Sequence, residues 1–124
     1  RICREPVHLV DIPPTVAALA GAKNPATGQG ININNAFQNK PLQREGNLYW
    51  QWGGGNAIRK GDMKLVRHNG GDWELYDLAK DRTELNDLAG EMPELVGALD
   101  EAWNAWWMEC TGSEFKPKTE SENK

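Results

Sequence analysis

The residues between 47 and 77 contain several short strand-forming stretches, each followed by a glycine-rich turn. Leu48, Trp50 and Trp52 alternate with Tyr49 and Gln51, which is the two-residue period of a β-strand. Glycines and small polar residues come after each stretch, and these residues adopt the backbone conformations that tight turns require. The sequence therefore predicts an antiparallel meander with strands at 48–52, 56–60, 63–68 and 73–77.

A long amphipathic helix is predicted after the meander. It opens at Pro93, and its apolar residues recur at steps of three and four, so that they form one buried stripe. The stripe consists of Leu95, Leu99, Trp103 and Trp106. We expect this helix to pack across one face of the sheet. The shared core is predicted to contain Trp50, Trp52, Leu65, Trp73 and Leu75.

The segment between the meander and this helix resembles a capping box. Asp81 and Glu84 stand three residues apart, as the two reciprocal capping side chains do at a helix start. The pattern predicts a short helical turn that carries Leu85 and Leu88 and stops at Gly90.

A first helix is expected near the start of the chain. Pro13 and Pro14 suit a first helical turn because the N–H that proline lacks would be unpaired there. Asp11 is a candidate cap, and Gly21 supplies a left-handed stop. A long connection rich in Asn, Gly and Pro then runs to residue 46. Such a connection is uncommon in a small domain and indicates a segment that lies against another surface.

These patterns predict an α+β fold: a four-stranded antiparallel sheet packed by a C-terminal helix, with an N-terminal helix and a long connection. The organisation expected along the chain has three parts. Residues 1–46 hold the first helix and the connection, residues 47–110 hold the sheet and the long helix, and residues 111–124 form a polar, disordered tail.

Composition restricts the classes of partner. The chain has 124 residues and a formal net charge of −4, which argues against nucleic acid or an anionic membrane surface as a partner. Residues 1–60 carry a formal +4 and residues 61–124 a formal −8. No apolar run approaches the ~18 residues of a membrane span.

No active site is evident from the residues alone. Cys3 and Cys110, with His8 and His68, form neither a metal-ligand spacing nor a nucleophile–base pair that the sequence can support. Whether the two cysteines form a bridge is left open. We assign no catalytic and no metal-binding residue.

Six tryptophans allow two interpretations, a core role and sugar stacking. The strand and helix periods account for at least five as core residues, and Trp52 beside the glycine turn is the best candidate for exposure. We expect a basic strand pair to meet either an anionic ligand or, across the strands, Asp and Glu side chains of the sheet. It consists of Arg59, Lys60, Lys64 and Arg67. The candidate substrate-binding residues are Trp52, Asn56 and Arg59.

Several segments resemble sulfatases, in the order that the family shows them. Residues 7–15 (VHLVDIPPT), followed by Ala20-Gly21 and Pro25, resemble the segment that ends the family's large catalytic domain. Residues 48–50 and 56–66 resemble the strand pair that opens its smaller C-terminal subdomain. The match continues through 73–78 (WELYDL), 81–89 (DRTELNDLA) and 93–96 (PELV). The resemblance covers about residues 5–110.

The resemblance implies a parent enzyme that hydrolyses sulfate esters. The family uses a formylglycine, made from the Cys or Ser of a C-x-P-x-R motif, and a divalent metal, usually calcium. Both lie upstream of the matched region. Cys3 is not in that motif, since Pro6 is one place late and no Arg follows it at the required spacing, and Cys110 is not either.

This chain is therefore expected to be a non-catalytic C-terminal fragment of an arylsulfatase-like hydrolase. Its expected partner is the parent's N-terminal catalytic domain, and the isolated fragment is expected to self-associate through apolar residues meant for that domain. The family resemblance also suggests a periplasmic or secreted location.

One segment departs from the family pattern. Residues 50–57 are WQWGGGNA, where the family often shows W-E-H-E-G-N-R-A. If this loop reaches the substrate in the parent, its specificity should differ from the common type. The alternative hypothesis is a free-standing carbohydrate-binding or protein-interaction module, which rests on the tryptophans and the lack of catalytic residues.

Overall fold

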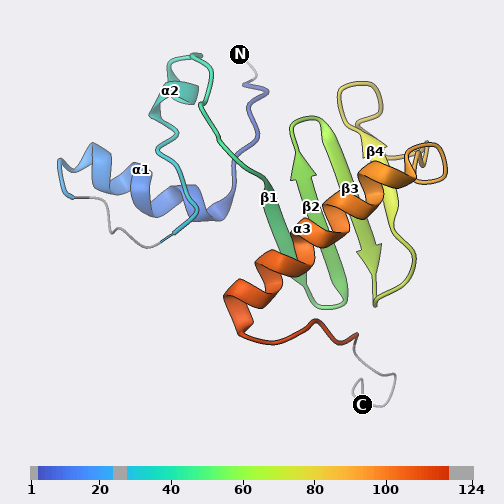
Figure 1. Ribbon diagram of the computed structural model, residues 1–124. Helices are drawn as coiled ribbons and strands as arrows, with labels where there is room; N and C mark the ends of the chain where they lie inside the picture. Colours follow the sequence, from blue (N-terminus) through green and yellow to red (C-terminus); the bar gives the residue numbers. More distant parts are fainter. Residues whose placement is uncertain (1–2, 24–27, 118–124) are drawn as a thin grey trace. The chain divides into compact units, whose positions relative to one another are not determined.

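The computed structural model describes residues 3–23 and 28–117 of the chain (Figure 1). The chain divides into two compact units, unit 1 (Arg1–Glu45) and unit 2 (Gly46–Lys124). The elements are those of an α+β fold with an N-terminal helix, one antiparallel sheet and a C-terminal helix, so the predicted fold class is confirmed.

Unit 1 begins with a 3-10 turn, η1 (Leu9–Asp11), that leads directly into helix α1 (Ile12–Leu19). The first turn of α1 carries the predicted prolines. The helix stops as predicted before Gly21, whose φ of 64° is the left-handed conformation that favours glycine. The connection that follows contains one more short helix, α2 (Asn34–Phe37).

The predicted capping role of Asp11 is wrong. Asp11 occupies the N-cap position of α1, but its side chain makes no hydrogen bond to that helix. Its backbone is already helical because η1 runs straight into α1, whereas a capping residue usually has extended dihedrals. The carboxylate instead accepts a hydrogen bond from the N–H of His8 at 2.7 Å and closes the preceding turn.

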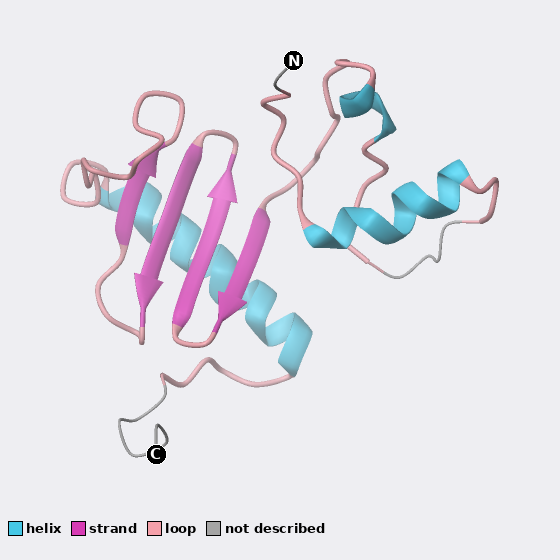
Figure 2. Cartoon of the chain, turned by 180° about the vertical axis from the view of Figure 1, so that it is seen from behind, coloured by secondary structure: helices cyan, strands magenta, loops and turns pink. Residues whose placement is uncertain are grey.

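Unit 2 contains the predicted meander. Its strands are β1 (Leu48–Trp52), β2 (Gly55–Lys60), β3 (Met63–His68) and β4 (Glu74–Asp77). Neighbours along the chain are neighbours in the sheet, and every pair is antiparallel. Helix α3 (Pro93–Thr111) crosses one face of this sheet, and Figure 2 shows the other face without a helix of unit 2 over it.

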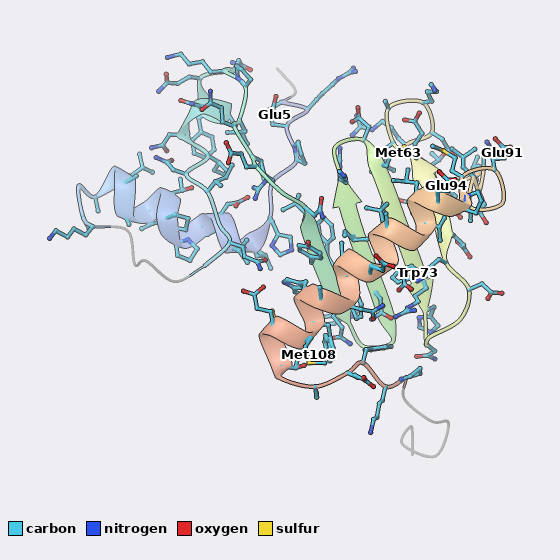
Figure 3. The ribbon with its side chains drawn as sticks, viewed as in Figure 1. Glu5, Met63, Trp73, Glu91, Glu94 and Met108 are labelled. Carbon is cyan, nitrogen blue, oxygen red and sulfur yellow. The ribbon has the colours of Figure 1, made fainter. Side chains whose placement is uncertain are left out.

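The core of unit 2 lies between α3 and the sheet. Ile58, Leu65 and Leu75 come from the three strands after β1, and Leu99 and Trp103 come from the predicted stripe of α3. Trp73 and Met63 pack against this cluster from the sheet side, where Figure 3 labels them. The helix ends at Gly112, whose φ of 69° is left-handed and whose N–H bonds to the carbonyl of Met108.

The predicted core is wrong in one respect, because Trp50 and Trp52 face away from α3. Tyr49 lies opposite Ile58, and Ile58 lies opposite Leu65, so these residues share the face that α3 covers. Trp50 and Trp52 are one residue out of step with Tyr49 and belong to the other face. The alternation of apolar residues shows which ones share a face, but not which face meets the helix.

The predicted helical turn after Asp81 is also wrong, since residues 78–92, all of them described, contain no helix. The Asp81 carboxylate accepts hydrogen bonds from the N–H groups of Leu85 and Asn86, which closes a loop. Glu84 has a φ of 56°, which no right-handed helix allows.

Two segments of unit 2 outside the sheet and helix are held by specific contacts. The amide of Leu75 in β4 donates to the side chain of Asp87, and its carbonyl accepts from Leu88, so this segment covers the sheet edge. Of the predicted tail 111–124, Thr111 ends α3 and Phe115 packs on Trp103. Residues 118–124 lie outside the described residues.

Candidate functional site

The three candidate substrate-binding residues do not come together. Trp52 and Arg59 lie on the face of the sheet that α3 does not cover, which we call the second face, at opposite ends of the first hairpin. Asn56 is one residue out of step with them, lies under α3 and is 1% exposed. Only Trp52 offers a large surface to solvent, with 88% of its area exposed, as the sequence predicts.

The turn beside Trp52 is held by hydrogen bonds. Gly53 and Gly54 connect β1 to β2, and Gly53 has a φ of 54°, which suits the first position of a tight hairpin turn. The side chain of Gln51 donates to the carbonyl of Gly53 at 2.8 Å, and the amide of Asn69 donates to the carbonyl of Gly54 at 2.7 Å. The end of β3 thus fixes the turn at the end of β1.

Trp52 belongs to a cross-strand row on the second face. Gly55 of β2 lies directly opposite it, and His68 of β3 lies opposite Gly55. The row therefore carries an indole on one side, an imidazole on the other and no side chain between them. The sequence pattern indicates Trp52 but not the other two, because only the register of three strands brings them into one row.

Acidic side chains partner Arg59 and Lys64 of the basic strand pair, but they come from a turn and a loop and not from facing strand positions as predicted. Lys64 Nζ lies 2.7 Å from a carboxylate oxygen of Glu84, and Arg59 lies 3.6 Å from Asp62. Arg59 also donates through Nε to the carbonyl of Gly61. These cations are therefore already partnered within the chain.

Another residue of the basic strand pair, Arg67, is enclosed by aromatic rings under α3. Its guanidinium lies 4.1 Å from the ring centre of Trp73 and also faces Trp103 and Phe115. Its Nε–H donates to Oδ1 of Asn56 at 3.2 Å, and Asp100 lies 3.7 Å away. Burial lowers the pKa of Arg67, and the Asp100 carboxylate partly opposes that shift. Arg67 and the aromatic rings around it are therefore part of the core of unit 2.

Tyr76 and Glu74 of β4 form a polar contact on the second face. The hydroxyl of Tyr76 donates to Glu74 at 2.7 Å. This hydrogen bond, the burial of the ring and the nearby negative charges raise the pKa of Tyr76 to about 12. The phenol is therefore a neutral donor at physiological pH.

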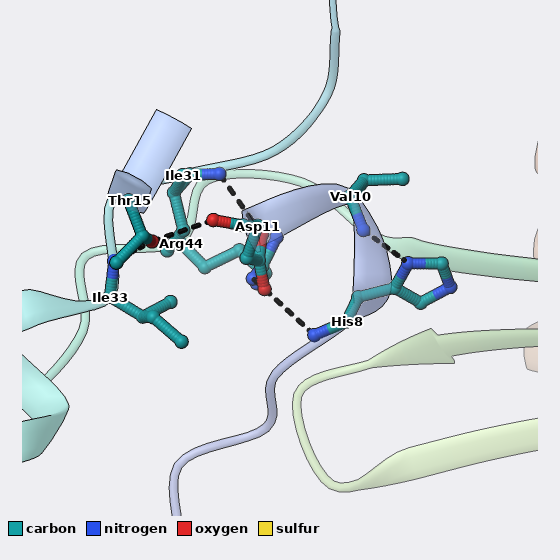
Figure 4. Close-up of polar contacts among 7 residues, drawn as sticks. All are labelled: His8, Val10, Asp11, Thr15, Ile31, Ile33 and Arg44. Carbon is teal, nitrogen blue, oxygen red and sulfur yellow. Dashed lines mark hydrogen bonds and ion pairs between the residues drawn. The ribbon is translucent and has the colours of Figure 1, made fainter. Parts of the chain in front are cut away.

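Unit 1 is organised by the buried carboxylate of Asp11 (Figure 4). Its oxygens accept hydrogen bonds from the amides of His8 and Ile31 and from the guanidinium of Arg44 at 2.5 Å. Burial alone would raise the pKa of Asp11, but the hydrogen bonds from Arg44, Ile31 and His8, with the Arg44 charge, lower it overall. Thr15 acts in parallel, accepting from the amide of Ile33 while donating to the carbonyl of Asp11.

These contacts tie the long connection to α1. The hydrogen bonds from backbone amides to side chains join residues 18 to 20 positions apart in the sequence, and the ion pair joins residues 33 positions apart. Local sequence patterns therefore give no signal for these contacts. At Gly30 the connection lies very close to the backbone of Val10, since a Cβ there would be 1.8 Å from its carbonyl oxygen.

Unit 1 exposes several large apolar side chains. Ile12, Val16 and Leu19 follow the helical spacing of four and three, and all three are exposed along α1. Further exposed apolar side chains of this unit are Val7, Leu9, Val10 and Phe37. We call these seven residues the apolar surface of unit 1.

The described residues do not fit the catalytic groups that the resemblance implies. No three His, Cys, Asp or Glu side chains among residues 3–23 and 28–117 lie together as a metal site requires. The exposed thiols of Cys3 and Cys110 lie outside any C-x-P-x-R motif. In the same part of the chain, no helix has both the length and the apolar character to span a bilayer.

No protein-family model matches the sequence. An uncharacterized sulfatase of Schizosaccharomyces pombe is 33% identical, over 82% of this chain and 21% of that protein. Arylsulfatase K of Rattus norvegicus is 31% identical, over 77% of this chain and 20% of its own length. The chain thus spans about a fifth of these curated relatives.

Solved structures of longer chains share the fold. Ps i-CgsB, solved in complex with k-i-k-neocarrahexaose, aligns with a TM-score of 0.72 and 25% identity over 97% of this chain and 28% of its own. BT4656, solved with its substrate D-glucosamine-2-N,6-O-disulfate, aligns with a TM-score of 0.54 and 25% identity over 74% of this chain and 23% of its own.

The ordered motifs of the first helix, the meander and the long helix agree with these sequence matches: the chain is related to the sulfatases and corresponds to a minor part of their length.

Proposed function

We propose that this chain is the non-catalytic C-terminal part of an arylsulfatase-like enzyme that hydrolyses sulfate esters. The observation that carries the proposal is the similarity to sulfatases over about four-fifths of the chain but only about a fifth of the relatives. The formylglycine nucleophile and the calcium ion of the family would then belong to the part of the parent that this chain does not span.

The apolar surface of unit 1 supports a docking role for residues 1–46. Its occupant, we propose, is the catalytic domain of the same parent. The exposed side chains Ile12, Val16 and Leu19 of α1 are apolar, with Leu19 68% exposed. An apolar surface of this kind on a small unit indicates an interaction partner. A partner within the same polypeptide agrees with the greater length of the relatives.

The substrate class that we propose for the parent is a sulfated sugar. Ps i-CgsB and BT4656 were solved with bound sugars, k-i-k-neocarrahexaose and D-glucosamine-2-N,6-O-disulfate. In this chain, Trp52 beside the glycine turn is the side chain best placed to contact a sugar ring. The arginine and lysine of the same face are occupied by Asp62 and Glu84 and are not proposed to bind the sulfate.

The experiment compares the full product of the reading frame that contains this chain with the 124-residue chain alone. Both are assayed for sulfate release from 4-nitrophenyl sulfate and from the two sugars. We expect release by the full product only, with loss of activity when the Cys or Ser of its C-x-P-x-R motif is replaced by Ala. Hydrolysis by the 124-residue chain would overturn the non-catalytic assignment, and an inactive, folded full product would overturn the sulfatase assignment.

The second candidate function is a free-standing carbohydrate-binding or protein-interaction module. The observation that favours it is the exposure of Trp52 on a rigid turn, which does not depend on a catalytic domain. A reading frame that begins immediately before Arg1 would favour this alternative. A longer frame with a C-x-P-x-R motif several hundred residues upstream would favour the enzyme.

A further inference from the structure

We propose that Trp52, Gly55 and His68 form a stacking site for one sugar ring on the second face of the sheet. The sulfated character of that sugar rests on the function proposed above, whereas the ring-stacking site itself rests on the geometry of three strands. The site would make unit 2 a part of the parent that holds a glycan, in addition to any role in packing.

The first observation is the position of Trp52. At 88% it has the highest exposed fraction of any large hydrophobic side chain in the described chain. Four of the other five tryptophans pack on the α3 side of unit 2, where Trp103 contacts Trp73, Trp106 and Trp107. Trp52 makes no contribution to that aromatic core, so its presence at the hairpin end is not explained by packing.

The second observation is the glycine between the two ring side chains. Gly55 does not have the positive φ that would demand glycine, and a Cβ there would meet only the carbonyl oxygen of Trp52, at 3.3 Å. A positive φ therefore does not account for this glycine, although a Cβ would make a tighter contact with the Trp52 carbonyl than is ordinary. Glycine within a strand often marks a place where another molecule approaches the backbone closely.

The spacing of the row suits a single pyranose ring. Adjacent strands lie about 4.8 Å apart, so the backbones at Trp52 and His68 are separated by about 10 Å, with Gly55 midway. A ring seated over Gly55 would meet the indole with its apolar C–H face. The imidazole of His68 would offer a hydrogen bond to a hydroxyl or a sulfate oxygen at the rim.

The third observation is that the site is fixed before any ligand arrives. The Gln51 and Asn69 hydrogen bonds hold both turn carbonyls. A Cβ at Gly54 would lie 3.1 Å from Cε1 of His68, so the imidazole rests against this turn. A preformed site loses little conformational entropy on binding, which favours the weak, single-ring contacts typical of sugars.

The composition around Trp52 favours a sugar over a protein partner. Protein-binding hot spots cluster several apolar anchors within a ring of contacts that excludes water. Here the row of Trp52 carries a glycine and an exposed histidine, and the next row of the same face, Trp50, Ala57 and Val66, is buried or half-buried. Trp52 is thus a single exposed aromatic surface, which matches the apolar face of one sugar ring.

The test measures binding of neocarrahexaose and D-glucosamine-2-N,6-O-disulfate to the 124-residue chain by isothermal titration calorimetry. We expect Trp52→Ala to weaken binding about tenfold or more, as expected for the loss of a stacked ring. Gly55→Val should do the same while Trp52 is kept, because a branched side chain then fills the row. The matched control is Leu85→Ala, which removes another highly exposed apolar side chain, 85% exposed, from the same unit.

Each outcome decides the proposal. Circular dichroism and thermal unfolding establish that the variants fold as the original chain does. Affinities of Trp52→Ala or Gly55→Val equal to the original, or equal losses in Leu85→Ala, would overturn the site, and so would failure of the chain to bind either sugar. This result is separable from the enzyme proposal, since sulfate release from 4-nitrophenyl sulfate by the full product needs no sugar ring at the site.

Discussion

The carboxylate of Asp11 and the guanidinium of Arg44 form a buried ion pair at 2.5 Å, although 33 residues separate them in the chain. The same carboxylate accepts a hydrogen bond from the amide of Ile31. Because Asp11 has no exposed side-chain surface, its charge depends on these partners for stabilisation. The pair therefore closes the long connection of unit 1 onto α1.

Asp11→Ala is expected to release the connection from α1. Removing one partner leaves the Arg44 charge buried without compensation, which costs about 3–5 kcal/mol of folding free energy. Hydrogen exchange at the amide of Ile31 should become fast, since its acceptor is gone. The control is Glu45→Ala, an exposed acid of the same unit, which should leave that protection unchanged. Equal protection of Ile31 in both variants would show that the ion pair does not hold the connection.

The sheet of unit 2 could be predicted closely because its signals are local. Alternation at 48–52 and turn residues such as Gly61, Asn69 and Gly70 lie within a few residues of the strands they define. The predicted strands agree with β1 to β4 within one residue at each end. The stripe of α3 likewise contains the buried residues of the helix, Leu99 and Trp103.

What the sequence did not predict depends on contacts between distant residues. The face of Trp50 and Trp52 was predicted wrongly because alternation leaves two choices of face, and only the packing of α3 selects one. The role of Asp11 was missed since its partners, Ile31 and Arg44, lie 20 and 33 residues away. For the candidate site, exposure of Trp52 was predicted, but its row with Gly55 and His68 required the register of three strands.

Tyr76 should give a pH-dependent contribution to stability. Its pKa is about 12 in the folded chain, above the usual value near 10, because its hydroxyl donates to Glu74. The contribution is fully present below pH ~10 and is lost as the pH rises through about 12. In a Tyr49→Phe background Tyr76 is the remaining tyrosine, and phenolate absorbance near 295 nm then reports its titration alone. Adding Glu74→Gln should lower that pKa, and an unchanged titration would refute the assigned cause.

Arg67 should contribute strongly to the stability of unit 2 through its aromatic surroundings. Arg67→Ala removes the stacked guanidinium and leaves Asn56 and Asp100 without it, which should lower the free energy of unfolding by about 3 kcal/mol. Arg67→Lys keeps the charge but loses the planar group and the Nε donor, and should cost about 1–2 kcal/mol. Urea unfolding followed by tryptophan fluorescence measures both. Lys80→Ala, at an exposed cation, serves as the control, and equal effects in all three would contradict this role.

Two glycines of the same helix should respond in opposite directions to alanine. Gly97 lies in the interior of α3 with open space around its Cα, so Gly97→Ala should stabilise unit 2 by about 0.5–1 kcal/mol. Gly112 ends the helix in the left-handed conformation, and Gly112→Ala should destabilise it by about 1 kcal/mol. Thermal unfolding monitored by circular dichroism distinguishes them. A loss of stability in both would mean that α3 does not tolerate a side chain at position 97.

The 124-residue chain alone is expected to self-associate through the apolar surface of unit 1, because no catalytic domain covers it. Val16 lies at the middle of the exposed stripe of α1, between Ile12 and Leu19, so Val16→Asp places a charge where two copies would meet. Sedimentation velocity should show concentration-dependent association of the original chain and a monomer for this variant. Leu85→Asp adds the same charge to unit 2 and should leave the association intact. If the original chain is monomeric at high concentration, or if Leu85→Asp also abolishes association, this surface is not the one that joins the copies.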